Sequence, residues 1–260
     1  MLARHCSKRR APVTASAELR RRRGPAFAWH FLLRGLLAIA LGVIAAAPAA
    51  AQLAGSVAID SDYRLRGYSL SGDQPAVSAQ LTYDDRSGLY FSLSGLGELG
   101  HGGQFLGVIA DAGYAKRLNE HVTIDAGVLR SQIRSPVSYL PGYKYTEVYA
   151  GAYVGPVVGR IYYSPDYRSA GLSTVYGELE AGFEPARNWR VSAHVGLLTH
   201  LNSKDFYHGG DTHGDWRIGV SRQFGNFEIH SALSGGKPYE YFGSRVHKKV
   251  AATVGASFSF

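Results

Sequence analysis

Charged side chains that alternate with apolar residues are the groups in this 260-residue chain best able to do chemistry. A spacing of two places successive side chains on one face of a β-strand. Carboxylates and guanidinium groups on one face can neutralise each other in ion pairs, or they can line an aqueous path for charged solutes. The candidates are Asp60, Asp62, Arg64, Arg66, Asp111, Asp125, Glu147, Arg160, Glu178, Glu180, Arg190, Asp215, Arg217 and Glu228.

Two serine–histidine pairs raise the alternative of a lipid-hydrolysing enzyme, which needs a serine, a histidine base and a group that orients the base. His230 and Ser231 are adjacent, so their side chains face opposite ways on a strand. Ser192 and His194 share a face, but it is the face expected to point inward, and the sequence shows no orienting acid. The chain also has no P-loop, dinucleotide or metalloprotease motif, so we predict that it is not an enzyme.

A histidine-containing loop raises the alternative of a metal site. The possible ligands in the loop 200–214 are His200, His208, Asp211 and His213. Their irregular spacing is more typical of a polar surface loop, which could equally belong to a non-conducting structural or adhesive protein. The single cysteine is Cys6, so the rest of the chain has neither a disulfide framework nor a cysteine-based zinc site. We predict no cofactor.

Apolar residues recur at every second position from about residue 55 onward, which is the period of a half-buried β-strand. The pattern predicts twelve strands, the first near 55–67 and the last near 246–260. The apolar face of the first strand is expected to consist of Val57, Ile59, Tyr63 and Leu65. The connections alternate between tight turns and longer loops, and residues of the Gly, Pro, Asn and Asp type populate both.

Two folds fit twelve such strands in an exported chain: a soluble sandwich or barrel with its apolar face inside, or an outer-membrane barrel with its apolar face in lipid. An even strand number with alternating short turns and long loops favours the membrane barrel. The other face is rich in Gly, Ser, Tyr and paired charges rather than in Lys and Glu. Because lipid offers no hydrogen-bond partners, the first strand must pair with the last. We therefore predict an all-β, closed, antiparallel transmembrane barrel.

Aromatic residues beside the tight turns support the membrane barrel, since aromatic girdles mark the membrane interface. They are Tyr83, Tyr114, Phe183, Trp189, Phe224, Phe227 and Phe260. The chain also ends on an amphipathic strand that closes with an aromatic residue. We predict that this strand carries a signal for the barrel-assembly machinery, formed by Val254, Phe258 and Phe260.

The net charge of +8 belongs to the N-terminal segment. Nine of the 28 basic residues and one of the 20 acidic residues precede Gln52, which leaves 19 of each sign after it. The basic start is followed by an apolar run at 31–47 and by three alanines at 49–51. This order predicts a cleaved signal peptide over residues 1–51, with the barrel in 52–260. The charge balance therefore predicts no nucleic-acid partner.

The segment at residues 61–76, SDYRLRGYSLSGDQPA, resembles an element near the start of the mature chain in the TorF family of porin-like proteins, a family also named Gcw_chp. The matching residues are Ser61, Asp62, Tyr63, Arg64, Arg66, Gly67 and Ser69. Weaker similarity covers most of residues 55–260, whereas the stretch at 130–136 departs from the family pattern. The resemblance implies a porin-like protein of the Gram-negative outer membrane, and the family's substrate is not established.

The fourteen charged candidates fall on the inward face of the predicted barrel. An Arg on the lipid face would cost about 2–4 kcal/mol at mid-membrane, which favours this assignment. Twelve strands predict a narrow passage for ions or small solutes. The nine acids and five arginines in the set predict a weak cation preference. The expected partners are outer-membrane lipid, the assembly machinery and small solutes or ions.

Overall fold

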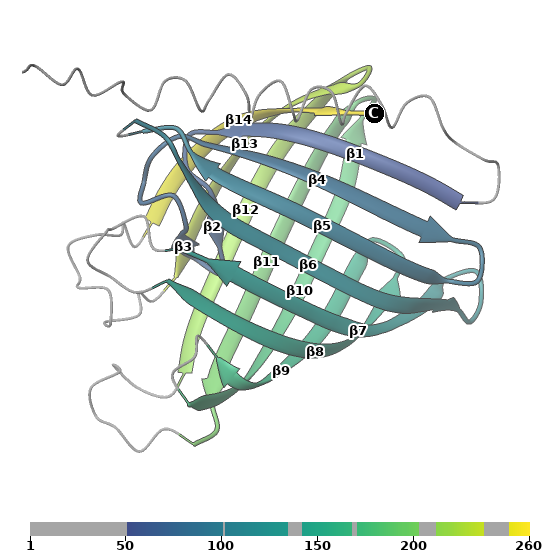
Figure 1. Ribbon diagram of the computed structural model, residues 1–260. Helices are drawn as coiled ribbons and strands as arrows, with labels where there is room; N and C mark the ends of the chain where they lie inside the picture. The colour runs from purple at the N-terminus through teal and green to yellow at the C-terminus, as the bar shows by residue number, and fades with distance from the viewer. Residues whose placement is uncertain (1–50, 101, 135–141, 168–170, 203–211, 237–249) are drawn as a thin grey trace, which may run out of the picture. The chain divides into compact units, whose positions relative to one another are not determined.

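Figure 1 shows the computed structural model, which describes residues 51–100, 102–134, 142–167, 171–202, 212–236 and 250–260. The signal peptide predicted at 1–51 lies outside the described residues apart from Ala51, which opens the first strand. Among the described residues, no helix has the length and apolar character needed to cross a membrane.

Twelve antiparallel strands close into a barrel, which confirms the predicted fold and strand number. The barrel strands are β1 (Ala51–Asp60), β4 (Ala76–Asp85), β5 (Leu89–Glu98), β6 (Gln104–Arg117), β7 (Val122–Ile133), β8 (Tyr143–Val154), β9 (Val157–Tyr167), β10 (Leu172–Ala186), β11 (Trp189–His200), β12 (Thr212–Phe224), β13 (Phe227–Gly236) and β14 (Val250–Ser259). The first and last strands pair as predicted, from Ser56 opposite Ser259 to Asp60 opposite Gly255. Closure leaves no open sheet edge.

The period of two in the sequence becomes an outward apolar face and an inward polar face. On β7, Ile124 and Val128 are 41% and 46% exposed, whereas Asp125 between them is 4% exposed. Tight turns join the strands at one end of the barrel, and longer connections join them at the other (Figure 1). Asn188 and Gly225 adopt the left-handed backbone that two-residue turns require, with φ of 65° and 63°. We call the two ends the turn end and the loop end.

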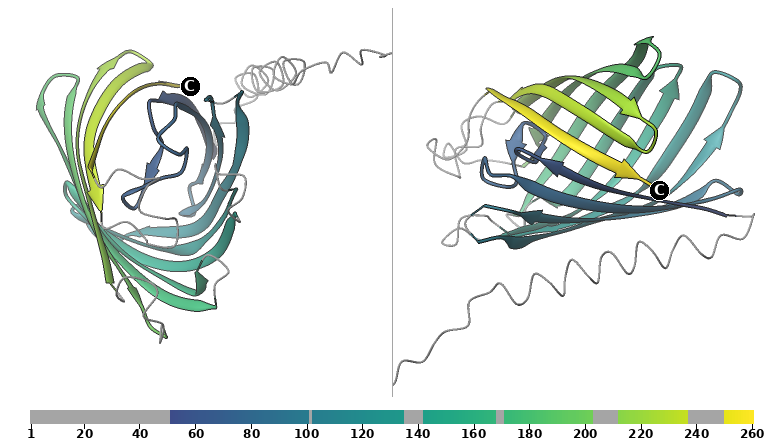
Figure 2. Two further views of the ribbon diagram at one scale, coloured as in Figure 1. Left: turned by 90° about the vertical axis from the view of Figure 1, so that its left-hand side faces the viewer. Right: turned by 90° about the horizontal axis from the view of Figure 1, so that it is seen from above.

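The first strand is shorter than predicted. β1 ends at Asp60, and the chain then forms a small separate hairpin from β2 (Arg64–Leu65) and β3 (Tyr68–Ser69). Figure 2, left, looks into the loop end and shows this hairpin within the ring of strands. The prediction that Tyr63 and Leu65 face lipid is therefore wrong. They pack instead against the buried apolar cluster inside the barrel.

The hairpin turns at Arg66 and Gly67, whose φ angles are 50° and 77°. Two consecutive residues with positive φ are typical of a tight two-residue hairpin, and glycine takes up this conformation without strain. Because the hairpin is itself β-structure, the alternation of apolar and charged residues runs on through it. The sequence pattern therefore could not show that β1 ends at Asp60.

Tyrosine rings and glycines alternate across the inner wall. Tyr90 and Tyr149 share one hydrogen bond of 2.5 Å between their hydroxyl groups. A Cβ atom at Gly127, opposite Tyr149 on the neighbouring strand, would lie 2.6 Å from the Tyr149 hydroxyl. The glycine therefore provides the space into which the ring folds.

This packing predicts that Gly127→Ala destabilises the barrel by about 1–3 kcal/mol, since the added methyl group overpacks a filled wall. Gly177→Ala is the matched control, because a Cβ at Gly177 meets nothing within 4 Å. The measurement is the temperature at which the folded band is lost in heat-modifiable gel migration. Equal transition temperatures for the two variants would contradict the prediction.

Candidate functional site

The hairpin is held in shape by its own charged side chains. Arg64 donates to Asp62 Oδ2 at 2.9 Å and to Asp73 Oδ1 at 3.3 Å, and its Nη2 donates to the Gly67 carbonyl at 2.7 Å. Asp62 Oδ1 also accepts hydrogen bonds from the hydroxyls of Ser69 at 2.5 Å and Ser71 at 2.9 Å. Asp62 and Arg64 thus stabilise the inserted segment, although the sequence placed them on the barrel wall.

The tip of the hairpin is fixed to the opposite wall by a buried ion pair. Arg66 Nη1 and Nη2 donate to the two carboxylate oxygens of Glu147, on β8, at 2.8 Å and 2.7 Å. The Arg66 guanidinium also lies 4.0 Å from the ring centre of Tyr176, on β10, and 5.1 Å from that of Tyr162, on β9. In the strand order of the barrel, β9 lies six strands away from β1, so the hairpin spans the full lumen.

The environment of Arg66 keeps it charged. Burial by itself lowers the pKa of the guanidinium, but the neighbouring Tyr167 and Glu147 groups raise it, and the resulting pKa lies well above its ordinary value. The Glu147 side chain is 1% exposed. A bidentate, desolvated pair of this kind is strongly directional, so it fixes the position of the hairpin tip.

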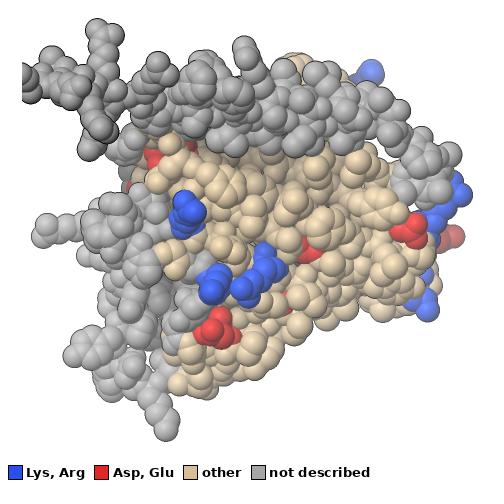
Figure 3. Space-filling model, viewed as in Figure 1, with Lys and Arg blue, Asp and Glu red and all other residues tan. Residues whose placement is uncertain are grey.

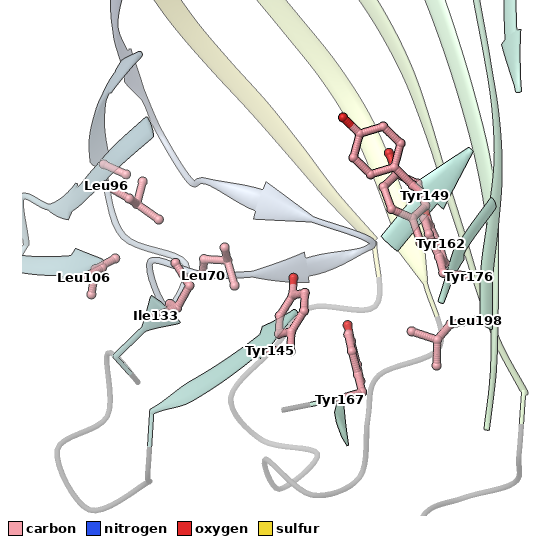
Figure 4. Close-up of a cluster of buried hydrophobic side chains, with 11 residues drawn as sticks. Leu70, Leu96, Leu106, Ile133, Tyr145, Tyr149, Tyr162, Tyr167, Tyr176 and Leu198 are labelled. Carbon is pink, nitrogen blue, oxygen red and sulfur yellow. The ribbon is translucent and has the colours of Figure 1, made fainter. Parts of the chain in front are cut away.

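An apolar cluster fills the space between the hairpin and the loop end of the wall (Figure 4). Leu70 follows the hairpin and belongs to the same cluster as Leu96 on β5, Leu106 on β6 and Ile133 on β7. The tyrosines of β8, β9 and β10 continue this cluster on the far side of the hairpin in Figure 4. The cluster therefore fills part of the barrel interior at the loop end.

A second group of polar residues surrounds His194 on the inner face of β11. His194 Nε2 lies 2.8 Å from Asp215 Oδ1, and its Nδ1 lies 3.4 Å from Glu180 Oε1. The Tyr176 hydroxyl donates to Asp215 Oδ2 at 3.2 Å. The expectation of no orienting acid near His194 is thus wrong. The structure gives no hydrogen bond between His194 and Ser192, however, so the pair is not arranged as a nucleophile and base.

The rings of Tyr149, Tyr162 and Tyr176 follow one another along the inner wall. A third polar group lies at the Tyr149 end of this row, whereas His194 lies at the Tyr176 end. Arg160 Nη2, on β9, lies 3.3 Å from Asp125 Oδ2 on β7, and Arg160 also contacts the Tyr153 hydroxyl. Glu178 accepts a hydrogen bond of 2.9 Å from Tyr162. Asp111 faces the same cavity as Arg160 but forms no ion pair with any described residue.

The remaining candidates lie on β1, β11, β12 and β13. His230 Nε2 is 2.7 Å from Asp60 Oδ1, and Ser221 donates to Glu228 Oε2 at 3.1 Å. Arg217 is 3.9 Å from Glu180, and its side chain is 53% exposed toward the lumen. Within the described part of the chain, Arg190 has no ion-pair partner. The fourteen charged candidates left out His194 and His230, although each occupies an inward position in the alternation.

Three cavities follow one another through the lumen. One of about 280 Å³ lies against the hairpin and includes Arg66, Arg160 and Arg217 in its lining. A second, of about 380 Å³, shares Arg160 with it, and a third, of about 370 Å³, shares Arg217. The third cavity also includes Arg190 and Glu228. Ten of the charged candidates thus line adjoining cavities inside the barrel: Arg64, Arg66, Asp111, Arg160, Glu178, Glu180, Arg190, Asp215, Arg217 and Glu228.

The proposed histidine ligands of a metal are only partly described. His200 and His213 meet inside the loop end with ring centres 5.6 Å apart, and both are buried. His208 and Asp211 lie outside the described residues. Within the described ranges, no set of three or more His, Cys, Asp or Glu side chains is placed to hold a metal ion.

A protein-family model described as "Bacterial protein of unknown function (Gcw_chp)" matches residues 44–254. The chain belongs to the Gcw_chp family. This confirms the resemblance to the Gcw_chp family, and the matched region includes the whole hairpin and its partner Glu147. No curated protein matches this Gcw_chp chain in sequence.

Solved structures share the barrel fold with this Gcw_chp protein. The NanC porin superposes with a TM-score of 0.52 at 10% identity, over 80% of this chain and 99% of that chain. The KdgM porin in complex with disordered oligogalacturonate gives 0.47 at 10% identity, over 80% and 99%. LpxR from Salmonella typhimurium gives 0.42 at 8% identity, also over 80% and 99%. At 10% identity, the likeness to the NanC porin shows the fold alone, which is that of an outer-membrane barrel.

Proposed function

We propose that this Gcw_chp protein is a porin-like channel of the Gram-negative outer membrane, exported by its signal peptide, through which ions or small solutes pass passively. The observation that carries the proposal is the division of the barrel into an apolar outer face and a polar inner face with adjoining cavities. A barrel that only had to anchor its loops would not need ionisable groups beside internal space. Single-channel recording of the purified protein in a planar bilayer tests the proposal, and the absence of unitary conductance steps would overturn it.

In this proposal the hairpin is the constriction of the channel. It crosses the lumen at the loop end, and its apolar cluster closes the side toward β5, β6 and β7. The path for solutes then runs past the polar side chains of β10–β13, where the third cavity lies. In this arrangement Asp62, Arg64, Arg66 and Glu147 hold the constriction. The candidates that border the path are Glu178, Glu180, Arg190, Asp215, Arg217 and Glu228, whereas Asp60, Asp111, Asp125 and Arg160 lie on other strands.

The charge of the inner face predicts a weak cation preference. The candidate set contains nine carboxylates and five arginines, and protonation of both His194 and His230 would raise the cationic groups only to seven. Reversal potentials in a salt gradient are therefore expected to favour the cation by a small ratio of about two to three, through the excess of acidic groups along the path. A reversal potential of the opposite sign would contradict this prediction.

A non-conducting structural barrel is the second candidate, because the packed core around the hairpin is what a sealed barrel requires. The two functions differ in a direct way. A sealed barrel shows no current with the hairpin in place and conducts once the hairpin is removed, whereas a channel conducts in both states.

We also propose that the last strand directs assembly. Val254 and Phe258 on β14 point outward and are 56% and 37% exposed, and Phe258 packs against Phe227 with ring centres 4.8 Å apart. Phe260 continues this row, with its ring centre 6.2 Å from that of Phe258. An exposed apolar edge row of this kind is available to the barrel-assembly machinery before β14 pairs with β1.

A further inference from the structure

The cavity of about 380 Å³ lies beside the proposed solute path rather than in it, because all of its lining residues belong to β4–β9. The outer surface of this side of the barrel is mostly uncharged (Figure 3). The inner side is different, since the lining of the cavity contains the carboxylates of Asp84 and Asp111. Asp84 is the next to last residue of β4, so the cavity extends toward the turn end.

Asp111 is the polar group of this cavity that the described part of the chain leaves without a partner. Its Oδ1 atom is shielded from solvent and accepts no hydrogen bond from any described residue. The side chain as a whole is half-buried, so a molecule in the cavity can reach the carboxylate. Because a shielded carboxylate oxygen without a donor is unfavourable, the site is incomplete until a bound molecule supplies one.

Arg160, the basic residue in the lining, is directed to a different carboxylate. Its Nε and Nη2 atoms each donate to Asp125 Oδ2 at 3.3 Å. Tyr90 donates to the same oxygen at 3.2 Å. Within the described ranges, neither Asp84 nor Asp111 forms an ion pair, so their negative charges are not compensated by the protein. The field in the cavity therefore favours a cation.

The other lining residues favour an organic cation over an inorganic one. They include an aliphatic side chain and four tyrosines: Leu129, Tyr90, Tyr149, Tyr153 and Tyr162. The Arg160 guanidinium lies 5.1 Å from the ring centre of Tyr153 and 6.0 Å from that of Tyr149, so these rings already accept a cation. A metal ion would need several oxygen or nitrogen ligands, and no set of three or more such acidic, His or Cys side chains is placed for this in the described ranges.

We propose that this cavity binds a small primary ammonium ion, which donates to Asp111 and lays its hydrocarbon part against the tyrosine rings and Leu129. A primary ammonium group carries both a positive charge and three donors, so it neutralises the carboxylate and satisfies the shielded oxygen together. Asp84 attracts the cation at the turn-end side of the cavity. The inference goes beyond the proposed function, because the site holds its ligand beside the path whether or not the barrel conducts.

Titration calorimetry on the purified, folded protein in detergent at low salt tests the proposal, with detergent alone as the background. The probes are n-butylammonium chloride and 1-butanol, which has the same carbon chain without the charge. We expect n-butylammonium to bind about tenfold more tightly than 1-butanol, and we expect D111N to bind n-butylammonium about tenfold more weakly than the unsubstituted protein does. E228Q is the matched control, because Glu228 is also an inward carboxylate but lines a different cavity, and it is expected to keep the affinity.

Four outcomes overturn the proposal: equal affinity for the two probes, unchanged affinity in D111N, an equal loss in E228Q, or displacement of n-butylammonium by an equal concentration of sodium. Heat-modifiable gel migration checks that each variant is folded. If D111N does not fold, D84N is expected to weaken binding about threefold, since Asp84 is exposed and its charge is more screened, and unchanged binding in D84N would then overturn the proposal. Because calorimetry needs no current, a protein that binds the amine but does not conduct would refute the channel function and leave this site intact.

Discussion

Replacement of residues 61–75 by an Asn-Gly turn is expected to raise the single-channel conductance on the order of two- to fivefold, because the bore of a twelve-stranded barrel is then free along its length. Asp60 and Ala76 are directly paired at the ends of β1 and β4, so a two-residue turn can join them without a change of register. Each barrel strand keeps its neighbouring strands in this variant, since β2 and β3 pair only with each other. The backbone hydrogen bonds that join Ser61 to Val254 and Leu99 to Pro75 are lost.

The deletion is compared with R130Q/K144Q, which changes two exposed side chains on the outer wall, one on β7 and one on β8. Because neither side chain faces the lumen, this variant is expected to leave the conductance unchanged. Heat-modifiable migration confirms that the deletion variant still forms a barrel. A folded deletion variant with the conductance of the unsubstituted protein would show that the hairpin does not limit the path. Current through the deletion variant alone would instead identify a sealed barrel in which the hairpin is the plug.

Glu147→Ala is expected to destabilise the protein by about 3–5 kcal/mol, since it leaves the buried Arg66 guanidinium without its anion. The guanidinium contacts the rings of Tyr162 and Tyr176, and neither ring supplies an anion in place of the lost carboxylate. We therefore expect the hairpin tip to leave the wall and the barrel to lose its folded gel band at a lower temperature. The paired variant R66M/E147L is expected to recover most of the loss, because both charges are then absent.

Glu228→Ala is the control for Glu147→Ala. Glu228 also lies on the inner face, but it is partly exposed and accepts a hydrogen bond from Ser221. Its removal is expected to cost about 0–1 kcal/mol, as for exposed ion pairs. Similar transition temperatures for E147A and E228A would contradict the importance of the Arg66–Glu147 pair. A paired variant no more stable than E147A would show that the packing around Arg66, rather than its charge, holds the tip.

The sequence by itself determined the barrel. The period of two fixes which residues face outward, the count of twelve strands follows from their turns, and the closure of β1 on β14 follows from the lack of hydrogen-bond partners in lipid. These features are local or are imposed by the solvent. Every residue of a strand obeys them without regard to what lies across the lumen, and for this reason the inward positions of Asp125 and Glu178 could be predicted.

Only the tertiary structure decided how the lumen is filled. The alternation at Tyr63–Arg66 is the same in a wall strand and in a small hairpin, so the fold of this segment depends on what it packs against. Arg66 meets Glu147 across 81 positions of the chain, and His194 meets Asp215 across 21. The Arg66–Glu147 pair forms because closure of the barrel brings distant segments to face each other across one enclosed space, where an unpaired charge is costly. The His194–Asp215 pair joins neighbouring strands, and it depends on the register between β11 and β12. A strand-by-strand pattern contains neither geometry.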